Sequence, residues 1–188
     1  MKLAVIGMGI AAILLLSGGY LAYDKTHILN ENRCWGCLAL NPTGKIYNGF
    51  WIDYPKEYGK GKIKHPDWLK NALNNTHVVM LFFWYKGCSA CKLLWEEMKE
   101  EGIVEGDEAN GKIVGFENVT LITIDTVNDE RKGALSIYSQ KGGSPTTVIL
   151  FKEDDTIYWY AFEGSNLPKD ENGKIVTVKE IIEDAIRG

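Results

Sequence analysis

The chain has 188 residues, of which 45% are hydrophobic and 24% charged, so we expect one globular domain with extensions and exclude a disordered chain. A formal net charge of −4 argues against a nucleic-acid partner, because such proteins present positive surfaces that displace phosphate counterions. Four cysteines are too few for a disulfide-dense scaffold, but they form two CxxC pairs, Cys34/Cys37 and Cys88/Cys91.

The first 23 residues predict a membrane segment. Lys2 is followed by 21 residues without a charge, Leu3 to Tyr23, which at ~1.5 Å rise each span about the ~30 Å hydrocarbon core of a bilayer. The positive charge at Lys2 favours a cytoplasmic N-terminus, which places the rest of the chain outside the cytoplasm, where disulfides persist. We expect an uncleaved anchor; the alternative is a signal segment cut near Ser17-Gly18-Gly19, which releases a secreted domain.

Residues 24–65 predict a loop-rich extension, because turn-forming residues interrupt every periodic pattern. Its aromatic residues, among them Trp51, are expected to pack on the following domain and to cover an edge of its sheet.

This extension contains Cys34-Trp35-Gly36-Cys37, and three interpretations of that pair stay open. It is a redox-active disulfide that exchanges electrons with Cys88/Cys91 or with a membrane partner, a static disulfide, or half of a zinc site. Zinc is the least favoured, because the 50 residues between the pairs exceed the spacing of compact zinc ribbons and because the metal would occupy Cys88.

Residues 66–188 predict an α/β domain with a mixed central sheet flanked by helices. The expected elements are a helix at 65–73, a buried strand at 77–85, a helix at 92–101, an insertion loop at 102–117, a strand at 119–125, a helix at 131–140, a hairpin of strands at 146–151 and 156–162, and a helix at 176–186. On the last helix Val178, Ile181, Ile182 and Ile186 share one apolar face.

The second pair, Cys88-Ser89-Ala90-Cys91, follows the buried strand and opens a helix. A helix N-terminus and the nearby Lys86 favour a thiolate at Cys88, lowering its pKa below the free value of ~8.5. Cys91 heads the apolar stripe formed with Leu94, Trp95 and Met98, so we expect Cys88 at the surface and Cys91 buried. An exposed nucleophile beside a buried resolving cysteine predicts thiol–disulfide exchange through a mixed disulfide.

The run from Phe83 to Lys92 resembles the active-site stretch of the thioredoxin superfamily, with Trp84 matching its tryptophan. A second stretch, Gly143 to Phe151, resembles that family's cis-proline loop and the strand after it. The resemblance covers residues 66–188 and implies a thioredoxin fold, a cis bond before Pro145, and a Ser144 backbone that pairs with substrate beside Cys88. It implies substrate-binding roles for Trp84, Ser144 and Pro145, and neither a cofactor nor a resident metal is expected.

Two departures from the family pattern are visible. Phe82 stands where general thioredoxins carry a buried acid, and the lysine that accompanies this acid aligns near Leu121. The Ser89-Ala90 dipeptide is closer to that of membrane-tethered extracytoplasmic thiol reductases than to the Gly-Pro of general thioredoxins.

We therefore expect a membrane-anchored thiol–disulfide oxidoreductase whose partners are client protein disulfides and an electron donor in the membrane reached through residues 3–23. Cys88 is the expected nucleophile and Cys91 the resolving cysteine, and reduction of clients is favoured over oxidation or isomerisation. The alternative is a non-enzymatic thioredoxin-fold binding or assembly module with structural or zinc-bound cysteines.

Overall fold

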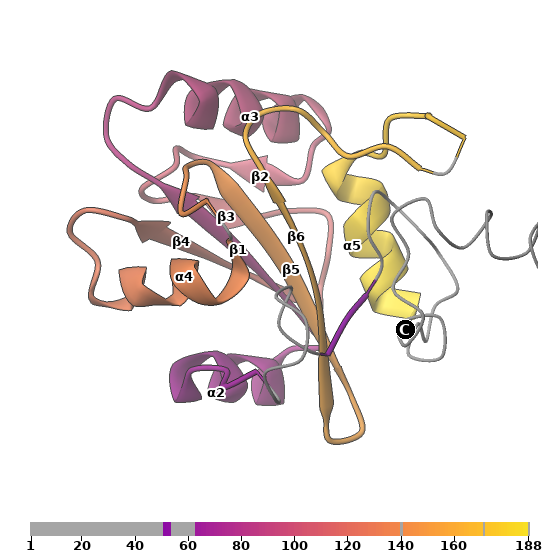
Figure 1. The fold of residues 1–188 in the computed structure, drawn as a ribbon. Coiled ribbons are helices and arrows are strands. Elements are labelled where there is room, and N and C mark those ends of the chain that lie inside the picture. The colour runs from indigo at the N-terminus through magenta and orange to yellow at the C-terminus, as the bar shows by residue number, and fades with distance from the viewer. Residues whose placement is uncertain (1–50, 54–62, 140, 171, 188) are drawn as a thin grey trace, which may run out of the picture. The chain divides into compact units, whose positions relative to one another are not determined.

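The computed structural model describes residues 51–53, 63–139, 141–170 and 172–187, all within one compact unit (Figure 1). The expected membrane segment at 1–23 and the Cys34/Cys37 pair lie outside the described residues. Within the described ranges, no helix combines the length and the apolar character needed to cross a bilayer.

A four-stranded mixed sheet forms the centre of the described unit. Strand β1 (Val78–Trp84) pairs in parallel with β4 (Val119–Asp125) and antiparallel with β5 (Thr146–Glu153), which in turn pairs antiparallel with β6 (Thr156–Glu163). The resulting order is β4-β1-β5-β6. The first six residues of β1 are buried, as expected for a central strand covered on both faces. The predicted α/β class with a mixed sheet is confirmed.

Helices cover both faces of this sheet (Figure 1). They are α2 (Asp67–Asn75), α3 (Ser89–Glu100), α4 (Leu135–Tyr138) with the preceding 3-10 helix η2 (Glu130–Ala134), and α5 (Val178–Arg187). Buried residues of α3 and α5 share one apolar cluster with alternate residues of β1 and β5, including Phe82 and Ile149. Because side chains alternate across a strand, this cluster marks one face of the sheet.

The structure corrects three sequence-based expectations about these elements. Helix α3 begins at Ser89, three residues before the expected start, because Cys88 caps it. The expected helix at 131–140 is a 3-10 turn followed by four α-helical residues, consistent with the weak helix propensity of Gly133. The expected loop at 102–117 contains a short hairpin of β2 (Val104–Glu105) and β3 (Lys112–Ile113).

The expected apolar face of the last helix is also partly wrong. Ile181 and Ile182 are fully buried, but Ile186 is 40% exposed and Ala185 is buried in its place. Helix α5 begins at Val178 because Thr177 and Glu180 exchange hydrogen bonds, the Thr177 N–H with Glu180 Oε2 (3.0 Å) and the Glu180 N–H with Thr177 Oγ1 (3.2 Å). This reciprocal pair is a capping box, which sets where the helix begins.

Trp51 belongs to the core of the sheet although it lies in the segment expected to be loop-rich. Its side chain is fully buried against Phe151 and Tyr160, and its indole N–H donates to Asp184 Oδ2 (3.0 Å). The adjacent Ile52 forms a backbone bridge with Trp159 on the edge strand β6. The structure thus confirms, for Trp51 and its neighbour, that this segment packs on the domain and covers a sheet edge.

Candidate redox site

The two cysteines of the second CxxC pair stand at the junction between β1 and α3. Strand β1 ends at Trp84, and the Cys88 N–H then donates to the Tyr85 carbonyl (3.1 Å) in a tight turn. Gly87 has a φ of 90°, a conformation that residues with a side chain rarely adopt, so glycine makes this turn possible. The turn delivers Cys88 to the position just before the first residue of α3.

Cys88 and Cys91 form a disulfide, with their Cα atoms 5.2 Å apart. The backbone N–H of Cys91 donates to Cys88 Sγ (3.0 Å), so the sulfur occupies the place of a helix N-cap oxygen. The same N–H and the positive end of the helix dipole stabilise a negative charge on that sulfur after reduction. The geometry therefore favours a thiolate at Cys88.

A cis peptide bond joins Ser144 to Pro145, as predicted from the sequence. Pro145 precedes β5, and the Ser144 carbonyl oxygen lies 3.8 Å from Cys88 Sγ. In the disulfide this sulfur carries no hydrogen, so the two atoms are only in close contact. In the dithiol form the Cys88 S–H can donate a hydrogen bond to this carbonyl. Gly142 and Gly143, which precede Ser144 in the chain, are exposed to solvent.

Trp84 lies at the same end of the sheet. Its side chain is half-buried against the apolar cluster that contains both cysteines, and its carbonyl accepts from the Thr126 N–H (2.8 Å) and Oγ1 (3.1 Å). The paired residue on β4 is Asp125, whose pKa is lowered by hydrogen bonds from the Val127 N–H and the Asn128 side chain. The structure thus brings Trp84, Ser144 and Pro145 together with Cys88 and Cys91 at one edge.

Cys88 is less accessible than expected. It is 6% exposed and Cys91 is 1% exposed, so the prediction of a surface cysteine beside a buried one is wrong for Cys88 in the disulfide form. The reason is tertiary: Cys88 Sγ faces the Ser144 carbonyl, which belongs to a loop 56 positions away in the sequence. The positions of residues along the helix do not predict that this distant loop covers Cys88.

Thr147 is a feature of the site region that sequence reasoning missed. It lies on β5 between Phe82 of β1 and Phe162 of β6, and it is fully buried. Its hydroxyl has no hydrogen-bond partner within the described part of the chain, whereas the neighbouring Thr146 hydroxyl donates to the Gly143 carbonyl (2.7 Å). The available signal was a pair of threonines, Thr146 and Thr147, at the start of a strand that continues with four apolar residues.

The strand order β4-β1-β5-β6, the CxxC disulfide at the N-terminus of the helix after β1, and the cis-proline before β5 match the arrangement that the resemblance in the sequence implies. The fold is thioredoxin-like. This assignment rests on the topology and on the placement of the cysteines and the proline.

Solved structures similar to this chain include two thioredoxins. The Trichomonas vaginalis thioredoxin is 19% identical, with 64% of this chain and 86% of that chain covered and a TM-score of 0.39. The Plasmodium falciparum thioredoxin is 17% identical, with 72% and 95% covered and a TM-score of 0.37. A malarial protein is 18% identical, with 59% and 96% covered and a TM-score of 0.32. No protein-family model and no curated protein matches the chain.

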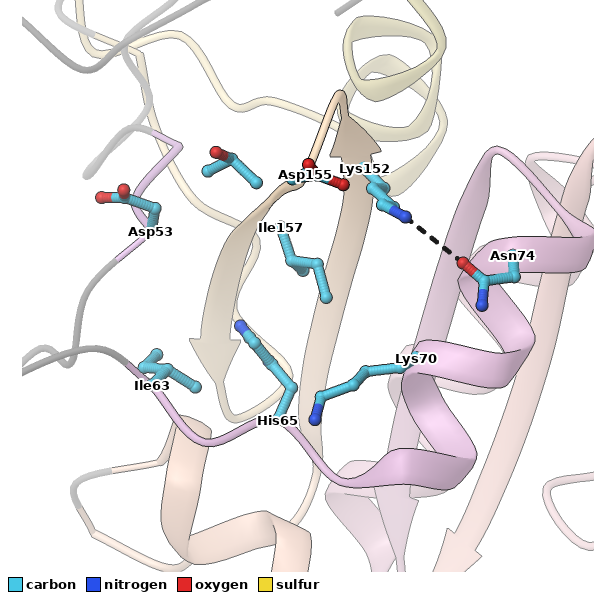
Figure 2. A pocket seen from close by; sticks show the side chains of 9 residues that line it. Asp53, Ile63, His65, Lys70, Asn74, Lys152, Asp155 and Ile157 are labelled. Atoms are coloured by element: carbon cyan, nitrogen blue, oxygen red, sulfur yellow. Dashed lines mark hydrogen bonds between the residues drawn. The ribbon is translucent and has the colours of Figure 1, made fainter.

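A cavity of about 360 Å³ lies far from the cysteines, where β5 ends and β6 begins beside α2 (Figure 2). It is lined by Asp53, Ile63, His65, Lys70, Asn74, Lys152, Asp155, Thr156 and Ile157. Its end of β5 pairs with the start of β1, whereas Cys88 follows the end of β1. Since no thiol is among these lining residues, the cavity is separate from the redox site.

The described residues contain no group of three or more His, Cys, Asp or Glu side chains placed to hold a metal ion. The chemistry that the site offers comes from its two sulfurs and the polar atoms around them. The Cys88–Cys91 disulfide in a thioredoxin-like fold fits a redox function.

Proposed function

We propose that the chain is a thiol–disulfide oxidoreductase that reduces disulfides of client proteins outside the cytoplasm. The observation that carries this proposal is the Cys91 N–H directed at Cys88 Sγ (3.0 Å), with the cis Ser144–Pro145 bond beside that sulfur. One sulfur is thus set up as a stabilised thiolate next to a backbone segment on which a client peptide can lie.

The proposed reaction has two steps. The Cys88 thiolate attacks one client sulfur, the client S–S bond breaks, and the other client sulfur leaves as a thiolate that takes up a proton. The Cys91 thiolate then attacks Cys88 Sγ, which releases the second client sulfur and forms the Cys88–Cys91 disulfide seen in the structure. Two electrons pass to the client, so a dithiol donor must restore the reduced form.

The supporting residues have distinct proposed roles. Ser144 and Pro145 hold the client backbone beside Cys88, and Trp84 packs under the same edge. The membrane segment at 3–23 tethers the domain near a membrane electron donor, and Cys34/Cys37 is a candidate relay between that donor and Cys88/Cys91. These last roles are proposals from the sequence.

The test uses the full chain and its Cys91→Ala variant. We expect the reduced parent chain to reduce insulin disulfides, and the variant to lose turnover and accumulate mixed disulfides on Cys88, because the resolving sulfur is missing. A Cys34→Ser/Cys37→Ser double variant serves as the control that separates the two pairs. In intact cells, a membrane-impermeant thiol reagent should label Cys88 of the reduced Cys91→Ala chain.

Two results would overturn the proposal. A parent chain without dithiol activity, together with no mixed disulfide on Cys88 in the variant, excludes the exchange reaction. Labelling only after the membrane is permeabilised excludes the extracytoplasmic location. A reduction potential near ~−120 mV for Cys88/Cys91 would assign oxidation of clients instead of reduction.

A further inference from the structure

The resolving step requires Cys91 to ionise in an apolar environment. Cys91 is 1% exposed and belongs to the cluster that includes Leu94, Trp95 and Phe82. An apolar environment penalises a thiolate, which is nevertheless the form that attacks. A polar group close to Cys91 would reduce this penalty.

Charged and titratable groups lie on the elements that form the apolar layer around Cys91, that is, the sheet face and helices that supply the cluster containing Cys91. These elements carry Asp125 on β4, Lys152 and Glu153 on β5, Tyr158, Tyr160 and Glu163 on β6, Lys179, Glu180, Glu183, Asp184 and Arg187 on α5, Glu105 and Lys112 on the small hairpin, and Lys92, Glu96, Glu97, Lys99 and Glu100 on α3. Asp184 accepts from Trp51 Nε1 (3.0 Å) and from Arg187 Nη2 (3.1 Å). Asp125 accepts from Val127 and Asn128 at the outer edge of β4.

Tyr160 lies farther from the cysteines than Thr147 does. It pairs with Ile149, which lies two residues after Thr147 on β5 and on the same face of the sheet. Burial raises the pKa of Tyr160, which keeps its hydroxyl protonated. The residues of β1 that face this layer are Val78, Met80, Phe82 and the half-buried Trp84, and only Trp84 carries a polar side-chain group, its indole N–H.

Thr147 faces the same layer as Cys91. Its cross-strand neighbours, Phe82 and Phe162, both belong to the cluster that contains Cys91, and opposed residues of paired strands point to the same side of a sheet. Thr147 is fully buried, and its hydroxyl has no hydrogen-bond partner in the described part of the protein. Since such a group is costly to bury, its presence in this strand calls for a function.

Two neighbours of Thr147, Ser144 along the chain and Phe82 across the sheet, contact Cys88 or the helix that carries Cys91. Pro145 lies two residues before Thr147, about 7 Å along the chain at ~3.4 Å per residue, and it follows Ser144, whose carbonyl oxygen lies 3.8 Å from Cys88 Sγ. Trp95, one helical turn after Cys91, packs on Phe82 with ring centroids 5.2 Å apart. Thr147 therefore lies on the sheet face that is covered by the cluster containing Cys91 and the buried residues of α3.

We propose that the Thr147 hydroxyl donates a hydrogen bond to the Cys91 thiolate when Cys91 ionises in the mixed disulfide. This inference rests on the proposed function of the Cys88/Cys91 pair. The hydroxyl keeps its own proton, and the Cys91 proton passes to the client thiolate released in the first step. The Cys91 sulfur supplies the electron pair for the new bond to Cys88, and the pair of the broken Cys88–client bond stays on the client sulfur.

The test measures how Cys91 ionises. In the full chain carrying Cys34→Ser, Cys37→Ser and Cys88→Ala, Cys91 is the sole thiol, and its alkylation rate is followed as a function of pH. Thr147→Val keeps the shape and removes the hydroxyl, so we expect the pH midpoint to rise by about one unit, a tenfold loss of thiolate below the midpoint. Thr147→Ser should restore the midpoint.

Thr120→Val is the matched control, because it removes a hydroxyl from β4 on the opposite face of the sheet, where Thr120 pairs with Val79. Thermal unfolding of each variant is followed in parallel, and Thr147→Ala replaces Thr147→Val if the latter does not fold. An unchanged midpoint in the folded Thr147 variants, or an equal shift in Thr120→Val, would overturn the inference. Because alkylation does not require turnover, a chain without insulin-reducing activity would refute the proposed function and leave this measurement interpretable.

Discussion

His65 is a buried histidine that the fold holds neutral. It is 8% exposed, and its Nδ1 lies 2.8 Å from the Tyr138 hydroxyl, which can donate only to an unprotonated nitrogen. Burial, followed by the nearby charge of Lys70, lowers the pKa of His65 from 6.5 to about 4. Protonation is therefore easier in the unfolded chain than in the folded one.

This difference predicts a loss of stability in acid. The contribution of neutral His65 is fully present above pH 6.5 and is lost as the pH falls toward 4, because the unfolded state binds the proton first. We expect the free energy of unfolding to fall by at most about 3 kcal/mol over this window from this residue. Urea unfolding across the window should show a weaker pH dependence in His65→Gln, while His77→Gln, at an exposed histidine, should match the parent.

At the scale of single elements, the ends of helices depend on particular hydrogen bonds. Helix α3 begins at Ser89 because the Cys88 sulfur accepts a hydrogen bond from the Cys91 N–H. The same hydrogen bond therefore sets the helix start and joins the two cysteines of the redox site. Helix α5 begins after Thr177 because of its reciprocal bonds with Glu180. The Thr-x-x-Glu spacing in the sequence is the signal that marks this start.

The capping box of α5 can be tested by stability measurements. Thr177→Ala removes the oxygen that accepts from the Glu180 N–H (3.2 Å), so we expect a loss of about 1 kcal/mol in the free energy of unfolding. Thermal or denaturant unfolding measures the loss, and Lys179→Ala, on the same turn, is the control with little expected change. Equal stability of Thr177→Ala and the parent would show that the cap contributes nothing.

At the scale of the whole molecule, Trp51 connects the segment before the α/β domain to its core. The fully buried indole contacts Phe151 and Tyr160 from the sheet and donates to Asp184 from α5. Three parts of the chain that are distant in sequence thus meet on one side chain. Its removal should weaken them together.

We therefore expect Trp51→Ala to lower the free energy of unfolding by about 3–5 kcal/mol, through lost burial and the cavity left behind. Trp51→Phe keeps most of the ring and removes the donor to Asp184, so a smaller loss of about 1–3 kcal/mol is expected. Circular dichroism during denaturation avoids the change in tryptophan fluorescence. Trp68→Ala, at a half-buried tryptophan on α2, is the control, and a loss there equal to that of Trp51→Ala would contradict a special role for Trp51.

Local patterns in the sequence predicted the parts of the fold whose cause is local. The apolar run at 77–85 predicted a strand buried on both faces, and β1 is such a strand over Val78 to Phe83. The strand predicted at 119–125 matches β4, and the cis bond before Pro145, which the family resemblance implied, is present in the structure. Ile186 was misplaced because helical periodicity gives a face without saying which layer of the molecule that face meets.

The sequence by itself determined that Cys88 and Cys91 are close enough to pair, because two residues separate them at a helix start. It also determined the strand–turn–helix around them and the apolar stripe behind Cys91. Only the tertiary structure decided that Cys88 is covered by the Ser144 loop, that the buried Thr147 hydroxyl has no hydrogen-bond partner among the described residues, and that Trp51 completes the core. The physical reason is that spacing fixes neighbours along one element, whereas burial and unmet hydrogen bonds depend on which distant elements pack together.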